Sequence, residues 1–272
     1  MSRRRRGGEY LILAAFGLMC ALAGVVIGLL LVRGGARTAV PEATPQATAQ
    51  PAETLSDLAE QWAGSVAEVE VEYQTGRRNQ QVDQGNGSGV YVDARGFFLT
   101  NYHVVADTLS LTVRLQDGRK LLVLDSAYDS TYDVAVLYTG PVEGVPAVRM
   151  GASSALRVGD TVFAVGYPRV GDDVLPGTLT SGVISGLNRL NVTAGNISPD
   201  VGMIQMDAAI NAGNSGSALF DMFGDLVGIP TMKIASGYGE ESFEGLAFAI
   251  PIDTARPIVI RLIDEIRAKD GQ

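Results

Sequence analysis

The chain is poor in the residues that covalent cross-links and metal sites require. It has one cysteine, Cys20, and one histidine, His103, among 272 residues. Because Cys20 lies in an apolar N-terminal segment, the rest of the chain has no disulfide in any compartment. A disulfide-rich small domain is excluded, and no cofactor or metal is expected. With 46% hydrophobic residues, packing must stabilise the fold.

Basic residues are scarce outside the N-terminus. Residues 1–37 hold six arginines and one glutamate, which leaves 15 basic against 29 acidic residues in the remainder. A chain of this charge is a poor partner for nucleic acid, so that class of function is disfavoured.

One long apolar run is present. Residues 11–32 are 22 consecutive residues without a charge, and a helix of that length spans the roughly 30 Å hydrocarbon core of a bilayer. Four arginines precede the run and two follow closely, so residues 1–10 are predicted to be a cytoplasmic tail, with the bulk of the chain in the periplasm or outside the cell. A cleaved signal peptide is the alternative, although its apolar region usually has only about 7 to 15 residues.

The remaining chain is divided by composition. Residues 33–54 are rich in Ala, Thr, Pro and Gln, which predicts a flexible linker. Residues 55–272 are predicted to fold, opening with a helix at 55–63 and closing with a helix at 253–269. The chain has 33 glycines, and between the two helices the glycines and the period-two apolar runs favour short strands, with about six on each side of Gly151. The strands are expected at residues 66–73, 89–92, 97–100, 109–115, 120–126 and 134–138, and then at 161–165, 177–187, 203–207, 218–220, 226–233 and 245–250.

Three segments offer the groups that acyl transfer needs: a nucleophile, a base and a carboxylate that orients the base. His103 follows a predicted strand and is the only candidate imidazole base. Asp133 opens an apolar strand, where a buried carboxylate needs a strong donor. Taken alone, each residue is more often structural.

The third segment is DAAINAGNSGSAL at residues 207–219, in which glycines flank Ser215. Such glycines let the backbone turn sharply, so the amides of Gly213 and Ser215 are predicted to form an oxyanion hole. Ser215 is then the nucleophile, His103 the base and Asp133 its orienting carboxylate. The order His, Asp, Ser is that of the chymotrypsin-type fold.

These segments, with others, resemble the HtrA/Deg proteases. The shared segments are NGSGVYVD at 86–93, TNYHVV at 100–105, YDVAVL at 132–137, LRVGD at 156–160, VGYP at 165–168, TSGVIS at 180–185, the Ser215 segment and GLAFAIP at 245–251. The resemblance implies an all-β fold of two six-stranded antiparallel β-barrels with the triad between them. It also implies cleavage of unfolded or damaged envelope proteins and, as in many relatives, a homotrimer. No peptide-binding domain is expected after the final helix.

Several residues depart from the family's pattern. Ser217 stands where a second glycine is usual, Ala212 where proline is common, and Pro230 lies in the strand expected beside the substrate, where it lacks a pairing N–H. Ala209, six positions before Ser215, is uncharged, which predicts cleavage after small or medium apolar residues rather than after Lys or Arg. The predicted substrate-binding residues are Ala209, Ile210, Ile229, Pro230 and Thr231.

The family's regulatory loops would fall at residues 74–84, 188–201 and 234–244. These segments either switch the activity on and off or are merely mobile surface loops. The main function expected is an anchored serine endopeptidase. A catalytically weak pseudoprotease that binds peptides at the membrane is the alternative, and a purely structural envelope protein is a third.

Overall fold

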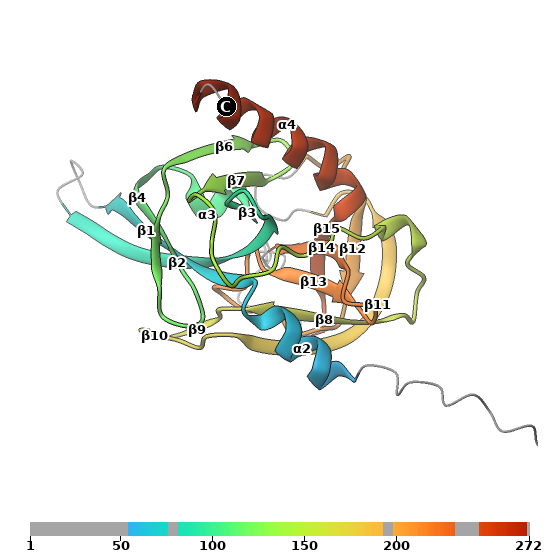
Figure 1. Cartoon of the computed structure of the whole chain (residues 1–272). Coiled ribbons are helices and arrows are strands. Elements are labelled where there is room, and N and C mark those ends of the chain that lie inside the picture. Colours follow the sequence, from blue (N-terminus) through green and yellow to red (C-terminus); the bar gives the residue numbers. More distant parts are fainter. Residues whose placement is uncertain (1–53, 76–80, 193–197, 232–244, 271–272) are drawn as a thin grey trace, which may run out of the picture. The chain divides into compact units, whose positions relative to one another are not determined.

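The computed structural model describes residues 54–75, 81–192, 198–231 and 245–270 (Figure 1). They belong to one compact unit, Glu53–Gln272. The predicted transmembrane helix at 11–32 lies outside the described residues, as does the predicted linker apart from Thr54. Within the described ranges, no helix combines the length and apolar character needed to cross a membrane.

The first half of the unit is a seven-stranded antiparallel sheet in the order β5-β4-β1-β2-β3-β7-β6. Its strands are β1 (Val66–Thr75), β2 (Gln81–Asp93), β3 (Phe97–Thr100), β4 (Thr108–Arg114), β5 (Lys120–Leu122), β6 (Asp125–Asp129) and β7 (Val134–Tyr138). The sequence predicts a closed six-stranded barrel here, with one strand over residues 120–126. That run instead breaks at residues 123–124, because β5 pairs with β4 whereas β6 pairs with β7. The chain thus passes between the two edges of the sheet, and the described strands do not close a hydrogen-bonded barrel.

The second half is the predicted closed six-stranded barrel, in the order β11-β12-β15-β14-β13-β8. It consists of β8 (Thr161–Gly166), β11 (Thr178–Arg189), β12 (Met203–Met206), β13 (Ala218–Asp221), β14 (Leu226–Thr231) and β15 (Ala247–Pro251). A small hairpin of β9 (Arg169–Val170) and β10 (Asp173–Val174) lies between β8 and β11 in the chain. The all-β fold is therefore confirmed, with one closed barrel rather than two.

Side-chain alternation explains why these segments form strands around separate cores. Along β1, Val69 and Val71 face the core of the first half, whereas Glu68, Glu70 and Glu72 lie on the other face. A second apolar cluster fills the closed barrel, and a third lies between the halves. The two halves thus share a buried interface.

Two helices extend that shared cluster. Helix α2 (Leu55–Ala63) buries Leu58 in it. Thr54 caps α2: its side chain accepts from the Asp57 amide, and the Asp57 carboxylate accepts from the Thr54 amide at 2.8 Å. Helix α4 (Ile252–Asp270) packs against β6 and β7 of the first half and β14 and β15 of the second (Figure 1). The apolar face of α4 is buried at Ile258, Leu262, Ile263 and Ile266.

The 74–84 segment differs from the loop expected there. Residues 74–75 and 81–84 continue the β1–β2 ladder, with Gln74 opposite Val82, so only residues 76–80, outside the described part, separate the two strands. The other expected loops lie partly or wholly outside it, at 193–197 and 232–244.

Candidate active site

His103 lies on a single turn of helix, α3 (Tyr102–Val105), that directly follows β3. Asn101 precedes the turn, and its side-chain amide donates to the carbonyl of Asp133 at 3.0 Å. This bond connects the end of β3 to the residue before β7. The His103 side chain is 25% exposed, so its ring is reachable from solvent.

Asp133 is completely buried and adopts φ +54°, a left-handed conformation that aspartate tolerates better than most residues. Its Oδ1 accepts from the His103 backbone N–H at 2.8 Å, and its Oδ2 lies 2.8 Å from His103 Nδ1. Because a carboxylate only accepts hydrogen bonds, this contact places the proton on Nδ1 and leaves Nε2 as an acceptor. Thr231 Oγ1 donates to the same Oδ2 at 3.2 Å.

Ser215 lies in the turn between β12 and β13, where two contacts hold its backbone. Its carbonyl accepts from Ser88 N–H at 2.8 Å, and the amide of Gly216 donates to the Pro230 carbonyl at 3.1 Å. At Gly216 φ is +80°, and a Cβ atom would lie 2.3 Å from the Ser88 carbonyl, so only glycine fits. This turn fixes Ser215 against β2.

The surroundings of Gly87 in β2 show that Ser215 lies near α3, the helical turn that carries His103. A Cβ atom at Gly87 would lie 2.5 Å from the Val104 side chain and 3.3 Å from the Ser215 carbonyl. Val104 is the neighbour of His103 on α3, so both segments converge on one point of β2. Among the hydrogen bonds between described residues, none joins the Ser215 hydroxyl to the His103 ring.

The segment before Ser215 has the backbone expected of an oxyanion site. Gly213 adopts φ +90°, and its carbonyl accepts from Ser88 Oγ at 2.7 Å. In the described part of the chain, neither the Gly213 amide nor the Ser215 amide donates to another residue. Both N–H groups therefore remain available as donors to a bound oxygen.

Ser88 is a residue whose part in the site the sequence did not single out. Its Oγ donates to the Gly213 carbonyl and accepts from the Tyr167 amide at 2.9 Å, so it connects β2 and the residue after β8 to the turn that carries Ser215. The sequence signal that could have identified Ser88 is a hydroxyl residue between two glycines in a buried strand. The Thr231 contact with Asp133 was missed in the same way.

The predicted substrate-binding residues lie in different surroundings. Ala209 is exposed, whereas the side chains of Ile210 and Ile229 are buried in apolar clusters. Pro230 is buried opposite Ala249 of β15. Their contact with substrate stays a prediction.

Of the other departures, Ala212 accepts at its carbonyl from the Arg169 amide at 2.8 Å, whereas Ser217 is fully buried and its hydroxyl has no hydrogen-bond partner among the described residues. The described residues also contain no group of three or more His, Cys, Asp or Glu placed to hold a metal ion.

Comparison with known proteins agrees with this geometry. Residues 87–229, just over half of the chain, match the trypsin-like peptidase domain family. The chain therefore belongs to the trypsin-like peptidases.

Its relatives are of the HtrA/Deg type, which confirms the resemblance seen in the sequence. The chain is 38% identical over 197 residues to serine endoprotease DegS of Escherichia coli, covering 72% of this chain and 54% of DegS. It is 38% identical over 193 residues to the Do-like protease HtrA of Bacillus subtilis, covering 69% of this chain and 41% of that one. The chain thus spans about half the length of the curated relatives it matches.

Solved structures show the same relationship. A structure of the HtrA-type protease AlgW with a tripeptide superposes with a TM-score of 0.65 at 32% identity, covering 78% of this chain and 64% of that one. AlgW with a decapeptide gives a TM-score of 0.63 at 30% identity, covering 78% and 68%.

Proposed function

We propose that the protein is a serine endopeptidase in which Ser215, His103 and Asp133 act as a catalytic triad. The observation that carries the proposal is the buried Asp133 carboxylate bound to both the ring and the backbone of His103. Membership of the trypsin-like peptidases supports it, as does the convergence of α3 and Ser215 on Gly87.

The reaction follows from these positions. Ser215 Oγ attacks the peptide carbonyl while His103 Nε2 takes its proton, and Asp133 stabilises the imidazolium that forms. The amides of Gly213 and Ser215 donate to the developing oxyanion. His103 then gives its proton to the leaving amine, which yields an acyl-enzyme, and water attacks this ester with the same base to release the second product.

Among its described residues the structure has no Ser215–His103 hydrogen bond, and this observation is the one that favours a peptide-binding pseudoprotease. Catalytic hydrogen bonds are often long in apo enzymes and shorten when substrate binds. We therefore propose that substrate draws Ser215 Oγ onto Nε2.

Unfolded or damaged proteins of the cell envelope are the proposed substrates, cut after small or medium apolar residues. The AlgW structures contain a tripeptide and a decapeptide, which supports a polypeptide ligand here. A peptide library cut mainly after Lys or Arg would contradict this specificity.

We further propose that residues 11–32 anchor the enzyme in the cell membrane, with the peptidase domain on the periplasmic or extracellular side. The support is the uncharged run and the arginines before it. A homotrimer is proposed from the resemblance alone.

Hydrolysis of unfolded casein by the full chain tests the catalytic assignment. Ser215→Ala should lower kcat by at least about 10⁴-fold, because removal of a triad member leaves only binding and oxyanion stabilisation. Equal cleavage by both proteins would refute the triad, and casein binding without cleavage by the wild type would establish the pseudoprotease.

A further inference from the structure

Two buried side-chain atoms in the turn that carries Ser215 have no hydrogen-bond partner among the described residues. They are Asn214 Oδ1 and Ser217 Oγ, on either side of Ser215 in the chain. Asn214 is 2% exposed and Ser217 is fully buried. Because a buried polar atom without a partner is costly, both atoms are expected to bind a further group.

Both side chains lie against Gly166, the last residue of β8. A Cβ atom at Gly166 would lie 2.6 Å from Asn214 Oδ1, 3.0 Å from Ser217 Cβ and 3.2 Å from Ser88 Oγ. Polar side chains of three residues thus surround one point of the backbone. Ser88 Oγ accepts one hydrogen bond there, and a hydroxyl oxygen has room for a second.

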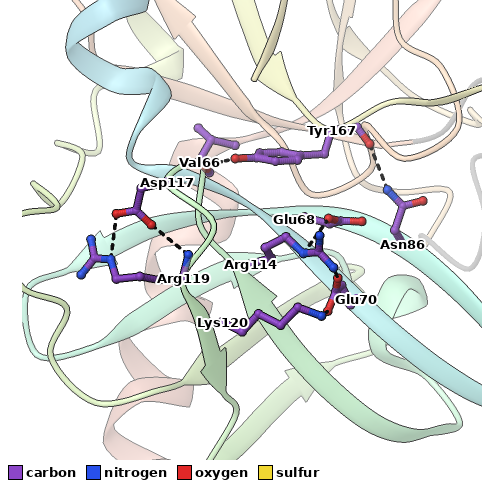
Figure 2. A network of polar contacts seen from close by, with 9 residues as sticks. All are labelled: Val66, Glu68, Glu70, Asn86, Arg114, Asp117, Arg119, Lys120 and Tyr167. Carbon is purple, nitrogen blue, oxygen red and sulfur yellow. Dashed lines mark hydrogen bonds and ion pairs between the residues drawn. The ribbon is translucent and has the colours of Figure 1, made fainter. Parts of the chain in front are cut away.

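The backbone at this point is held in place through Tyr167, the residue after Gly166. The Tyr167 carbonyl accepts from Asn86 Nδ2 at 3.0 Å, and the Tyr167 hydroxyl donates to the Val66 carbonyl at 3.2 Å (Figure 2). The Tyr167 amide donates to Ser88 Oγ at 2.9 Å. The wall against which Asn214 and Ser217 lie is therefore restrained at three atoms of one residue.

Burial limits the size of the missing group. Ser217 has no exposed surface, so no substrate side chain reaches its hydroxyl. Single waters are the usual partners of buried polar atoms, with about three hydrogen bonds each. One water that donates to Asn214 Oδ1 and Ser88 Oγ and accepts from Ser217 Oγ satisfies all three groups.

Ser217 also holds the peptide group that carries one of the two oxyanion donors. Its N–H donates to the Asn214 carbonyl at 3.1 Å, and the amide of Ser215 lies at the other end of that planar peptide group. A bridge from Ser217 to the Asn214 side chain therefore holds Asn214 at a second atom. The direction of the Ser215 N–H follows from the orientation of Asn214.

We propose that Ser217 is a positioning residue for the oxyanion site, and that its hydroxyl binds one buried water shared with Asn214 Oδ1. The bridge aims the Ser215 N–H at the developing oxyanion. The inference deepens the proposed function and rests on it for catalysis, whereas the water site does not depend on activity. Glycine, usual at this position in the family, has no hydroxyl with which to form the bridge.

Casein hydrolysis by the full chain tests the positioning role. Ser217→Ala should lower kcat about tenfold, the effect of one hydrogen bond, and leave KM unchanged, because the oxyanion forms only in the transition state. The matched control Ser65→Ala removes another fully buried hydroxyl, which donates to the Pro146 carbonyl at 2.7 Å, and should leave kcat unaltered. Full activity of Ser217→Ala would overturn the proposal.

A double-mutant cycle shows whether Ser217 acts through Asn214. In an Asn214→Ala background the water has lost its acceptor, so Ser217→Ala should lower kcat by less than about twofold further. The same tenfold loss in both backgrounds would mean that Ser217 acts independently of Asn214, which contradicts the bridge.

A crystal structure of the full-length Ser215→Ala protein tests the water site without catalysis. We expect one water within about 3.2 Å of both Asn214 Oδ1 and Ser217 Oγ. A dry site, or a direct bond between the two side chains, would overturn the bridge. If the wild type cleaves no casein, the positioning role falls with the peptidase proposal; if the wild type cleaves casein and Ser217→Ala is equally active, the positioning role alone falls.

Discussion

Asp133 is completely buried, yet its side chain has donors on both oxygens. The backbone amide and ring of His103 hold it from one side, and the Thr231 hydroxyl from the other. Thr231 belongs to β14 in the second half, whereas Asp133 precedes β7 in the first. One hydroxyl therefore fixes the histidine's partner across the two halves, which makes Thr231 a positioning residue.

Removing that hydroxyl gives the first prediction. Thr231→Val keeps the shape of the side chain but leaves Asp133 Oδ2 one donor short, which costs about 1 kcal/mol of stability. We expect kcat for casein to fall about tenfold, with KM little changed, because His103 is held less firmly. Thr231→Ser restores the donor and should restore kcat; a valine variant with full activity would show that the bond is dispensable.

Glu68 gives a second prediction, on how the free energy of unfolding depends on pH. Since burial raises the pKa of the folded-state carboxyl, folding favours its protonated form, and the stability associated with that proton is lost as pH rises through the folded pKa. Glu68→Gln mimics the protonated form, so it should increase the free energy of unfolding at pH 7 and leave it unchanged near pH 3.5. Urea denaturation at both pH values measures this, and a variant destabilised at pH 7 would contradict it.

At the scale of the element, the turn before Ser215 depends on glycine. A Cβ atom at Gly213 would lie 2.4 Å from the Tyr167 carbonyl in addition to having φ +90°. Gly213→Ala must therefore displace the turn and its amide donor. Loss of one oxyanion donor costs about 10²- to 10³-fold in kcat, and we expect a loss in that range for casein hydrolysis.

Gly118 is the matched control, because it has φ +88° and a Cβ atom added there would meet nothing within 4 Å. Gly118→Ala meets the same backbone strain without a collision, so it should cost about 1 kcal/mol of stability and leave kcat unchanged. Equal activity of the two alanine variants would show that Gly213 has no special part in the site.

The sequence predicts most helices and strands because the alternation of apolar and polar residues and the turns at glycines are local features of the chain. Helix 55–63 and the strands at 97–100 and 134–138 have the predicted bounds. The break at residues 123–124 was not predictable, because residues 121–124 are an unbroken apolar stretch and the division depends on pairing with two different strands. At the site, the sequence singles out His103 as the only histidine and Asp133 as the acidic residue that opens an apolar strand, and the structure brings the two side chains together. The contacts of Ser88 with the Gly213 carbonyl and of Thr231, predicted to bind substrate, with Asp133 were missed because each joins residues far apart in the chain.

At the scale of the whole molecule, α4 joins the two halves. Ile266 is fully buried in the apolar cluster that both halves share, whereas Ile260 of the same helix is 52% exposed. Ile266→Ala should lower the free energy of unfolding by about 2 to 5 kcal/mol, and Ile260→Ala should change it by less than about 0.5 kcal/mol. Guanidinium denaturation followed by circular dichroism measures both; similar effects of the two changes would mean that α4 does not hold the halves together.

The contacts of α4 also bear on when the enzyme becomes active. A ribosome makes α4 after every described strand of both halves, and domains fold as their segments emerge. Until α4 emerges, the shared core lacks the helix that packs on both sheets, and the contact between Thr231 and Asp133 forms across an interface that is not yet complete. We therefore expect the nascent polypeptide to stay proteolytically silent during translation, which protects the chain itself from premature cleavage.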